Sequence, residues 1–232
     1  MTTVTILSGG AAQGLVRGLA EPFKAQTGLG IDGEFGAVGF MADKLRAGTA
    51  ADLVILTQAL LAKLAAEKLV IPASIADIGR VETALAVRSR DPKVSVKTEA
   101  DLRDVLRSAD AIYVPDTRAS TAGQHVAKVL DQLGIAYEVA SRLKIFPNGA
   151  TAMRELAAST AQRPIGCTQA TEIIATDGIA LSGSLPSGSE LVTMYTAGVT
   201  ARATHPTEAA ALIALLTGAD RKELRQSMGF AG

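Results

Sequence analysis

Glycine-rich turns follow strand-like segments at several places in the sequence, and a helix-like segment follows each turn. In residues 35–57 a strand ends at Gly36, Gly39 opens an apolar 3.6-residue pattern, and a second apolar run closes the stretch. Glycines leave room for a ligand at the free N–H groups of a helix start, where an anion is favoured. The same pattern recurs at the turns that begin with Ser8, Thr121 and Asn148.

Polar residues at these turns could contact such an anion. Ser8 ends the first strand and is either a hydroxyl donor to a ligand or an ordinary helix cap, and Thr121 offers the same alternatives. Arg118 lies in the loop before Thr121, where it could hold a carboxylate through two parallel hydrogen bonds or lie solvated. The sequence therefore indicates a site for a small anion.

Side chains for acid–base or covalent chemistry are sparse. Cys167 lies in an apolar segment without a neighbouring histidine, which favours a buried, inert thiol over a nucleophile. His125 flanks an apolar helix stripe, which favours a surface position over a catalytic one, and Glu172 is a general-base candidate. With one cysteine and two histidines, no Cys- or His-rich metal site is possible, and we expect neither metal nor cofactor.

Composition narrows the class of partner. Lys+Arg and Asp+Glu are both 23, so a nucleic-acid surface or a polybasic membrane patch is not expected. Aromatic residues make up only 3% of the chain, which excludes base-stacking platforms and an aromatic sugar site. A small, non-aromatic ligand is the remaining expectation.

The sequence also carries expectations about location. No segment is long and apolar enough to span a bilayer, and a strand at residues 4–8 follows Met1 almost at once. We expect no membrane insertion and a cytoplasmic protein as the chain stands, or a periplasmic one if an upstream leader has been removed. A transporter partner is expected only for an exported form.

The elements that position these residues alternate between strands and helices, which is typical of α/β proteins. Two segments near 81–88 and 192–200 have the residue pattern of extended strands, and we interpret them as the crossover strands between two parts of the chain. We therefore expect two doubly wound sheets joined by two crossover strands, with residues 1–80 and 196–232 in lobe 1 and 81–195 in lobe 2. The ligand cleft is expected between these lobes.

Three motifs give the sequence a resemblance to a known family. They are Met41-Ala42-x-x-Leu45 with Gly48 and Ala51-Asp52-Leu53, then Thr121-Ala122-Gly123, and Asn148-Gly149-Ala150. The sequence resembles, over nearly its whole length, the molybdate-binding type II periplasmic solute-binding proteins. The resemblance implies a two-lobed fold that binds a tetrahedral oxyanion through neutral donors.

The donors that the resemblance implies are only partly present here. The first hydroxyl donor of that family corresponds to Ser8 in this sequence. The second corresponds to Ala37 or Val38, where the hydroxyl is absent, and the family's tyrosine corresponds to Gln169. The family's two backbone N–H groups fall on the residues Ala122 and Gly149. Because each such donor contributes about 1.5–3 kcal/mol, a metallate should bind weakly and a small carboxylate is the better expectation.

Two functions stay open at this point. One is a small-anion binding protein that resembles the substrate-binding component of ABC transporters; the other is a cofactor-independent isomerase of a small polycarboxylate on the same fold. Arg118 or Lys44 could neutralise a second carboxylate of either ligand. The expected ligand-binding residues are Ser8, Gly9, Gly10, Ala37, Val38, Gly39, Thr57, Arg118, Thr121, Ala122, Gly149 and Gln169.

Overall fold

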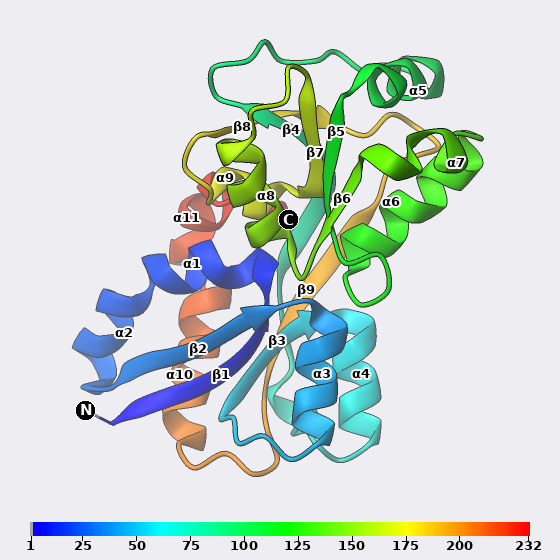
Figure 1. Ribbon diagram of the computed structural model, residues 1–232. Helices are drawn as coiled ribbons and strands as arrows, with labels where there is room; N and C mark the ends of the chain where they lie inside the picture. The colour runs from blue at the N-terminus through cyan, green and yellow to red at the C-terminus, as the bar shows by residue number, and fades with distance from the viewer. Residues whose placement is uncertain (1) are drawn as a thin grey trace. The chain divides into compact units, whose positions relative to one another are not determined.

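The computed structural model describes residues 2–232, which form two compact units. Unit 1 comprises the chain up to Val81 together with Met194–Gly232, and unit 2 comprises Glu82–Thr193. Each unit combines a strand layer with helices, and Figure 1 traces them from the N-terminus to the C-terminus. The strands and helices expected from the hydrophobic periodicity are largely confirmed, with the differences given below.

Unit 1 is built on four strands in the order β2-β1-β3-β9. Strand β1 runs parallel to both β2 and β3, whereas β9 is antiparallel to β3. The bounds of these strands are β1 Thr3–Gly9, β2 Gly30–Gly36, β3 Leu53–Thr57 and β9 Val192–Val199. Because β1 and β3 are parallel and adjacent, the residues that follow them lie at one edge of this sheet.

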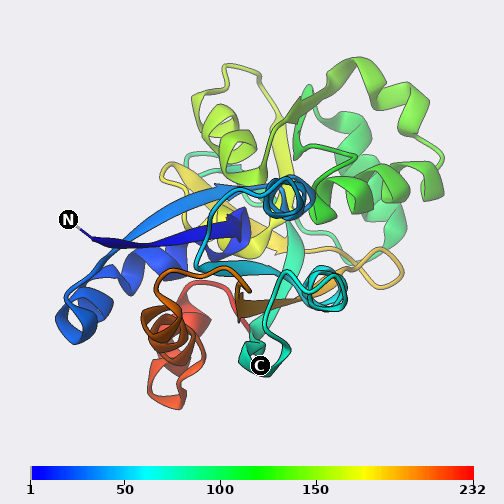
Figure 2. The same ribbon diagram turned by 90° about the horizontal axis from the view of Figure 1, so that it is seen from below.

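Helices cover both faces of the unit 1 sheet. Figure 2 shows α3 on one side of β1 and β2 and the helices α1, α2 and α10 on the other. The α-helices are α1 Gln13–Gly18, α2 Ala20–Thr27, α3 Val38–Arg46, α4 Gln58–Ala66, α10 Pro206–Thr217 and α11 Lys222–Ser227. The 3-10 helices are η1 Gly10–Ala12, η2 Pro72–Ser74 and η4 Ala219–Arg221.

Leu15, Leu19 and Phe23 follow one another at the spacing of a single helix face, but the helix that carries them is divided in the structure. Helix α1 ends at Gly18 and α2 begins at Ala20, with Leu19 between them. Pro22 explains the break, because a proline has no N–H to donate to the carbonyl four residues earlier. All three apolar side chains are nevertheless fully buried in the core of unit 1.

Unit 2 contains a mixed sheet in the order β4-β7-β5-β6, and β8 pairs with β4. Strand β5 runs parallel to both of its neighbours, β6 and β7, whereas β4 is antiparallel to β7 and to β8. The bounds are β4 Ala76–Arg88, β5 Ala111–Pro115, β6 Leu143–Phe146, β7 Pro164–Gln169 and β8 Ile179–Ser184.

The helices of unit 2 also divide between two faces. Figure 1 shows α8 and α9 on one side of the strands and α5, α6 and α7 on the other, and two separate apolar clusters fill the two sides. The helices are α5 Glu99–Ser108, α6 Thr121–Gln132, α7 Ala136–Val139, η3 Ala140–Arg142, α8 Gly149–Ala158 and α9 Ala170–Ile174.

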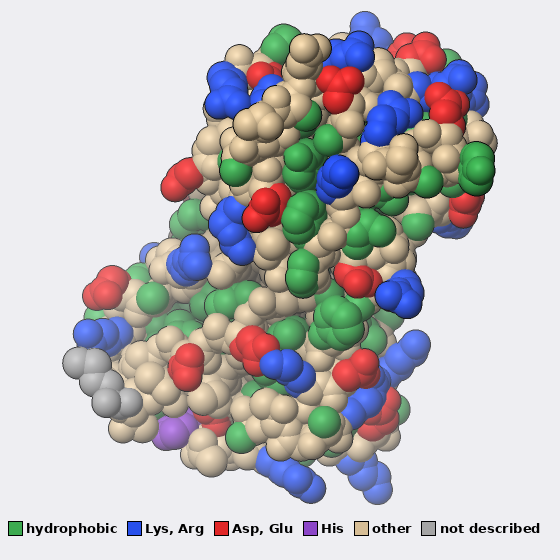
Figure 3. Space-filling model, in the orientation of Figure 1, with side chains coloured by type: hydrophobic (Ala, Val, Ile, Leu, Met, Phe, Trp, Pro, Cys, Tyr) green, Lys and Arg blue, Asp and Glu red, His purple; other side chains and the backbone are tan. Residues whose placement is uncertain are grey.

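Charged side chains of both signs are mixed on the face of the molecule in Figure 3, where Lys and Arg side chains are interspersed with Asp and Glu side chains. Within residues 2–232, no helix has both the length and the apolar character that a bilayer crossing requires.

Candidate functional site

The carboxyl edge of the unit 2 sheet brings three of the predicted segments together. In the β5–β7 ladder, Tyr113 lies opposite Gly166, and continuing this register by three residues places Asp116 level with Gln169. Neighbouring strands are about 4.8 Å apart, so the loop after β5 and the end of β7 are adjacent. Strand β6 ends at the same edge, because Pro115 lies opposite Phe146.

Helix α6 begins directly against the end of β5. A Cβ atom at Gly123 would lie 2.1 Å from the carbonyl oxygen of Asp116, so only glycine allows this close approach. Ser120, rather than Thr121, is the N-cap, and its hydroxyl accepts a 3.5 Å hydrogen bond from the Gly123 N–H. This cap leaves the N–H groups of Thr121 and Ala122 for another acceptor.

The loop before α6 is held by Asp116, whose carboxylate also attracts the positive charge of Arg118 without a direct ion pair. The Asp116 carboxylate accepts hydrogen bonds of 2.7 and 2.8 Å from the N–H groups of Arg118 and Ala119, which lower the pKa of this carboxyl. The Arg118 side chain is exposed, and its guanidinium makes no hydrogen bond or ion pair within residues 2–232. A cationic side chain therefore lies three residues before Thr121, the first residue of α6.

Helix α8 also begins at this edge, but its first N–H groups already have an acceptor. The carboxylate of Glu172 accepts a 2.6 Å hydrogen bond from the Thr168 hydroxyl and further bonds from the N–H groups of Gly149 and Ala150. Burial raises the pKa of Glu172 to about 7, although these hydrogen bonds and one from the Gln169 N–H oppose the shift. Glu172 thus places an internal carboxyl group where an external anion was expected.

Gln169 differs from its neighbours because its polar atoms are buried without partners. Its side chain is 2% exposed, and neither its Oε1 nor its Nε2 atom has a hydrogen-bond partner in the described chain. Two nearby hydroxyls share this state: that of Thr83, which lies opposite Gln169 in the β4–β7 ladder, and that of Thr171, two residues along the chain. Since buried polar groups normally have partners, this group of three residues is a candidate for ligand contact.

The sequence did not single out Thr83 and Thr171. Thr83 lies in an extended segment 86 positions before Gln169, and only the antiparallel pairing of β4 with β7 brings the two together. Thr171 had a weak signal, since a hydroxyl two residues after a strand end is often at a helix start. Neither position has a local pattern that separates a ligand donor from an ordinary strand or helix threonine.

In unit 1, the predicted donors lie at the ends of β1, β2 and β3. Ser8 is fully buried and its hydroxyl donates a 2.9 Å hydrogen bond to the carbonyl of Gly9. Thr57 caps α4 by accepting from the Leu60 N–H at 3.4 Å. The remaining predicted residues of unit 1 lie at two helix starts: Gly9 and Gly10 at η1, and Ala37, Val38 and Gly39 at α3.

The α3 start of unit 1 has no side-chain cap. Ala37 is the N-cap residue and offers no side-chain acceptor, and a Cβ at Gly9 would lie 2.7 Å from the Cγ1 atom of Val38. The ring of Tyr195 is also close, with Cε1 3.1 Å from that Cβ position. Val38 and Tyr195 are therefore apolar neighbours of the glycine that ends β1.

Three further residues singled out in the sequence have partners of their own. The Nε2 atom of His125 lies 2.8 Å from the carbonyl oxygen of Ser189, and Lys44 forms an ion pair with Glu34. Burial raises the pKa of the Cys167 thiol to about 12, so this thiol is inert at neutral pH. Lys44 is accordingly a less available cation than Arg118.

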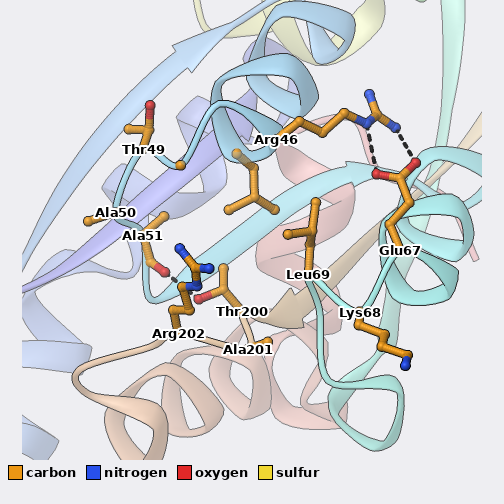
Figure 4. Close-up of a pocket in the computed structure, with 12 residues that line it drawn as sticks. Arg46, Thr49, Ala50, Ala51, Glu67, Lys68, Leu69, Thr200, Ala201 and Arg202 are labelled. Atoms are coloured by element: carbon orange, nitrogen blue, oxygen red, sulfur yellow. Dashed lines mark hydrogen bonds and ion pairs between the residues drawn. The ribbon is translucent and has the colours of Figure 1, made fainter.

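A separate hollow of about 340 Å³ lies in unit 1 at the opposite end of β3. Figure 4 shows that Arg46 reaches Glu67, with which it makes hydrogen bonds of 2.8 and 2.9 Å, and that the Lys68 side chain extends away from Arg202. The Thr200 hydroxyl donates to the carbonyl of Ala51. None of the residues that line this hollow has a buried side-chain atom without a partner, in contrast to Gln169 and its neighbours.

Open helix starts and buried neutral donors at strand ends are features of proteins that bind small solutes. The chain belongs to the bacterial extracellular solute-binding protein family, whose family model matches residues 4–231. This membership confirms the solute-binding class that the three sequence motifs indicated.

Two solved structures share the fold. The periplasmic molybdate-binding protein of Azotobacter vinelandii is 16% identical, with 99% of each chain covered and a TM-score of 0.83. The sulfate-binding protein SubI of Mycobacterium tuberculosis H37Rv is 19% identical, with 99% of this chain and 86% of that chain covered and a TM-score of 0.76. These likenesses confirm the expected type II periplasmic-binding-protein fold.

One relative by sequence bears the name of an enzyme. An aconitate isomerase from Pseudomonas sp is 27% identical over 240 residues, which cover 99% of this chain and 87% of that protein.

Proposed function

We propose that this protein binds a small carboxylate, and that unit 2 supplies its principal contacts. The observation that carries the proposal is the contrast between two helix starts at one sheet edge. The α8 start is filled by the protein's own Glu172, whereas the α6 start retains the N–H groups of Thr121 and Ala122 and has Arg118 beside it. An external anion is therefore expected at α6.

The donor geometry favours a planar carboxylate over a tetrahedral metallate. Two N–H groups at a helix start and one guanidinium suit the two oxygens of a carboxylate. A metallate needs donors around a whole tetrahedron, but the hydroxyl expected at Ala37 or Val38 is absent and Gly149 donates to Glu172. When ionised, Glu172 would also repel a dianion at the α8 start.

The names of the relatives support anion binding in general, and one of them names a carboxylate. A molybdate-binding and a sulfate-binding protein share the fold, and the relative named aconitate isomerase acts on a tricarboxylate. Ser8 and Thr57 of unit 1 stay predictions as ligand contacts, and so does the expected ligand cleft. A role with an ABC transporter belongs to the proposal only for an exported form of the protein.

A thermal-shift panel followed by titration calorimetry tests the proposal. The panel contains succinate, malate, citrate, cis-aconitate and trans-aconitate, with molybdate, tungstate and sulfate as competing oxyanions. A ligand that binds only the folded protein raises the apparent melting temperature by mass action. We expect at least one carboxylate to do so, and tighter binding of an inorganic oxyanion than of every carboxylate would contradict the proposal.

A second candidate function is a cofactor-independent isomerase of a small polycarboxylate. It is favoured by the aconitate isomerase relative and by Glu172, whose pKa near neutrality suits proton transfer. Against it, the Glu172 carboxylate already accepts four hydrogen bonds. Proton NMR of cis- or trans-aconitate in deuterated buffer separates the two, because an isomerase exchanges a substrate proton and a binding protein does not.

A further inference from the structure

The side chain of Gln169 contains two kinds of unused hydrogen-bonding group. The Nε2 atom offers donors and the Oε1 atom is an acceptor, and both are buried without partners among residues 2–232. The backbone around this side chain is fixed, since Gln169 ends β7 opposite Thr83 and begins α9 as its N-cap residue. The amide is therefore presented from two rigid elements.

We infer that the ligand is a hydroxycarboxylate whose hydroxyl group pairs with the Gln169 amide, an inference that rests on the carboxylate-binding function proposed above. An ionised carboxylate has only acceptor oxygens, so it satisfies Nε2 and leaves Oε1 unpaired. A hydroxyl group donates to Oε1 and also accepts from a neighbouring donor. An unpaired buried acceptor opposes binding, so the site selects for a ligand with a hydroxyl.

The two neighbouring hydroxyls reinforce this requirement. The side chains of Thr83 and Gln169 lie on the same face of the sheet because the two residues are directly opposite in the ladder. The hydroxyls of Thr83 and Thr171 are buried and unpartnered as well, and a hydroxyl can donate or accept. These three side chains carry no charge, which suits the polar, uncharged part of a ligand.

The groups that would bind a ligand carboxylate follow β5, the strand next to β7. Asp116 is level with Gln169 in the register of β5 and β7, and the loop from Asp116 leads through Arg118 to the α6 start. A ligand carboxylate at the N–H groups of Thr121 and Ala122 would therefore leave its neighbouring carbon near Gln169. The arrangement fits a di- or tricarboxylate whose hydroxyl is on a carbon next to a carboxylate.

Titration calorimetry with matched ligand pairs tests the inference. Malate is compared with succinate and citrate with tricarballylate, because each pair differs by one hydroxyl group. For the wild-type protein we expect the hydroxyl-bearing member to bind at least tenfold more tightly in at least one pair. In Gln169→Leu this preference should fall below threefold, whereas Gln132→Leu, at the exposed end of α6, should retain it.

A second variant tests the same inference if Gln169→Leu does not fold. Thr83→Val removes a hydroxyl with little change of shape, and we expect it to reduce the preference at least threefold. Equal affinities within both pairs for the wild-type protein would overturn the hydroxyl inference and leave carboxylate binding standing. Binding of no carboxylate at all would overturn both proposals, and an undiminished preference in Gln169→Leu would remove the amide from the site.

Discussion

A Cβ atom at Gly149 would lie 1.9 Å from the Oε2 atom of Glu172 and 2.2 Å from the hydroxyl oxygen of Thr168. Neither neighbour is free to move, because Thr168 and Glu172 are buried and hydrogen-bonded to each other. Glycine at position 149 is thus required by a buried carboxyl group of the same chain. Gly149 was expected to contact a ligand through its N–H group, but in the structure it contacts the Glu172 carboxyl group.

Gly149→Ala should therefore destabilise the protein. The added methyl group displaces the Glu172 carboxyl from the α8 start, and we expect the free energy of unfolding to fall by about 3 kcal/mol. Urea denaturation measures this change. Gly183→Ala is the matched control, because no atom lies within 4 Å of a Cβ at that position, and it should change stability by less than about 0.5 kcal/mol.

Glu172 should give stability a dependence on pH between about 4.5 and 7. Burial raises its pKa from 4.5 to about 7 in the folded protein, so the folded state binds the proton more tightly than the unfolded state. The free energy of unfolding should then fall as pH rises through this window, by on the order of 3 kcal/mol. Urea denaturation from pH 5 to 8 measures the slope.

Substitution isolates the contribution of Glu172 to that slope. Glu172→Gln should flatten the dependence between pH 4.5 and 7, while Glu155→Gln, exposed on α8, should leave it as in the wild-type protein. An unchanged slope in Glu172→Gln would show that another group titrates in this range.

Asp52 should have the opposite effect on stability. Burial raises its pKa, but hydrogen bonds from the N–H groups of Thr5 and His205 and from the hydroxyl groups of Thr204 and Thr5 outweigh burial and lower the pKa well below 3.8. Its contribution is complete above the unfolded pKa and is lost as pH falls. Asp52→Asn should lower the free energy of unfolding at pH 7 by on the order of 2 kcal/mol.

The difference between Asp52→Asn and the wild-type protein should shrink as pH is lowered from 5 to 3. Asp32→Asn, at an exposed position in β2, serves as the control and should follow the wild-type protein at each pH. A constant difference across this range would mean that the charge of Asp52 is not what stabilises unit 1.

Arg118 should contribute to ligand binding through charge. We expect the best carboxylate to bind at least tenfold more tightly than molybdate, a difference of about 1.4 kcal/mol. Arg118→Ala and added salt should both weaken carboxylate binding, because an exposed ion pair is screened. Lys128→Ala, exposed elsewhere on α6, should retain the wild-type affinity in calorimetry. Equal loss in both variants would point to overall charge rather than a contact.

Ser8→Ala should weaken ligand binding with a small loss of stability. The Ser8 hydroxyl donates to the Gly9 carbonyl, so its removal should cost about 1 kcal/mol of unfolding free energy. Ser227→Ala removes a comparable hydroxyl-to-carbonyl bond at an exposed site in α11 and should not change affinity. Wild-type affinity in Ser8→Ala would remove this hydroxyl from the set of ligand contacts.

The sequence by itself determined most of the local structure and the family. The apolar spacing of Val38, Met41 and Leu45 specifies the helix α3, whose buried face carries those side chains. The absence of a hydroxyl at Ala37 and Val38 is also evident from the sequence, and it argues against a metallate as the ligand. The break between α1 and α2 also has a cause in the sequence, because Pro22 lacks the N–H group that a continuous helix requires there.

Tertiary structure decided which of the predicted donors are available. Gly149 and Glu172 are 23 positions apart, and Thr83 and Gln169 are 86 apart, so no local pattern relates the members of either pair. Helix propensity and hydrophobic period act over a few residues, whereas these contacts arise from the order and register of β4, β7 and β5. The order and register of the strands therefore bring Glu172 to the α8 start, leave the α6 start open and place Thr83 opposite Gln169.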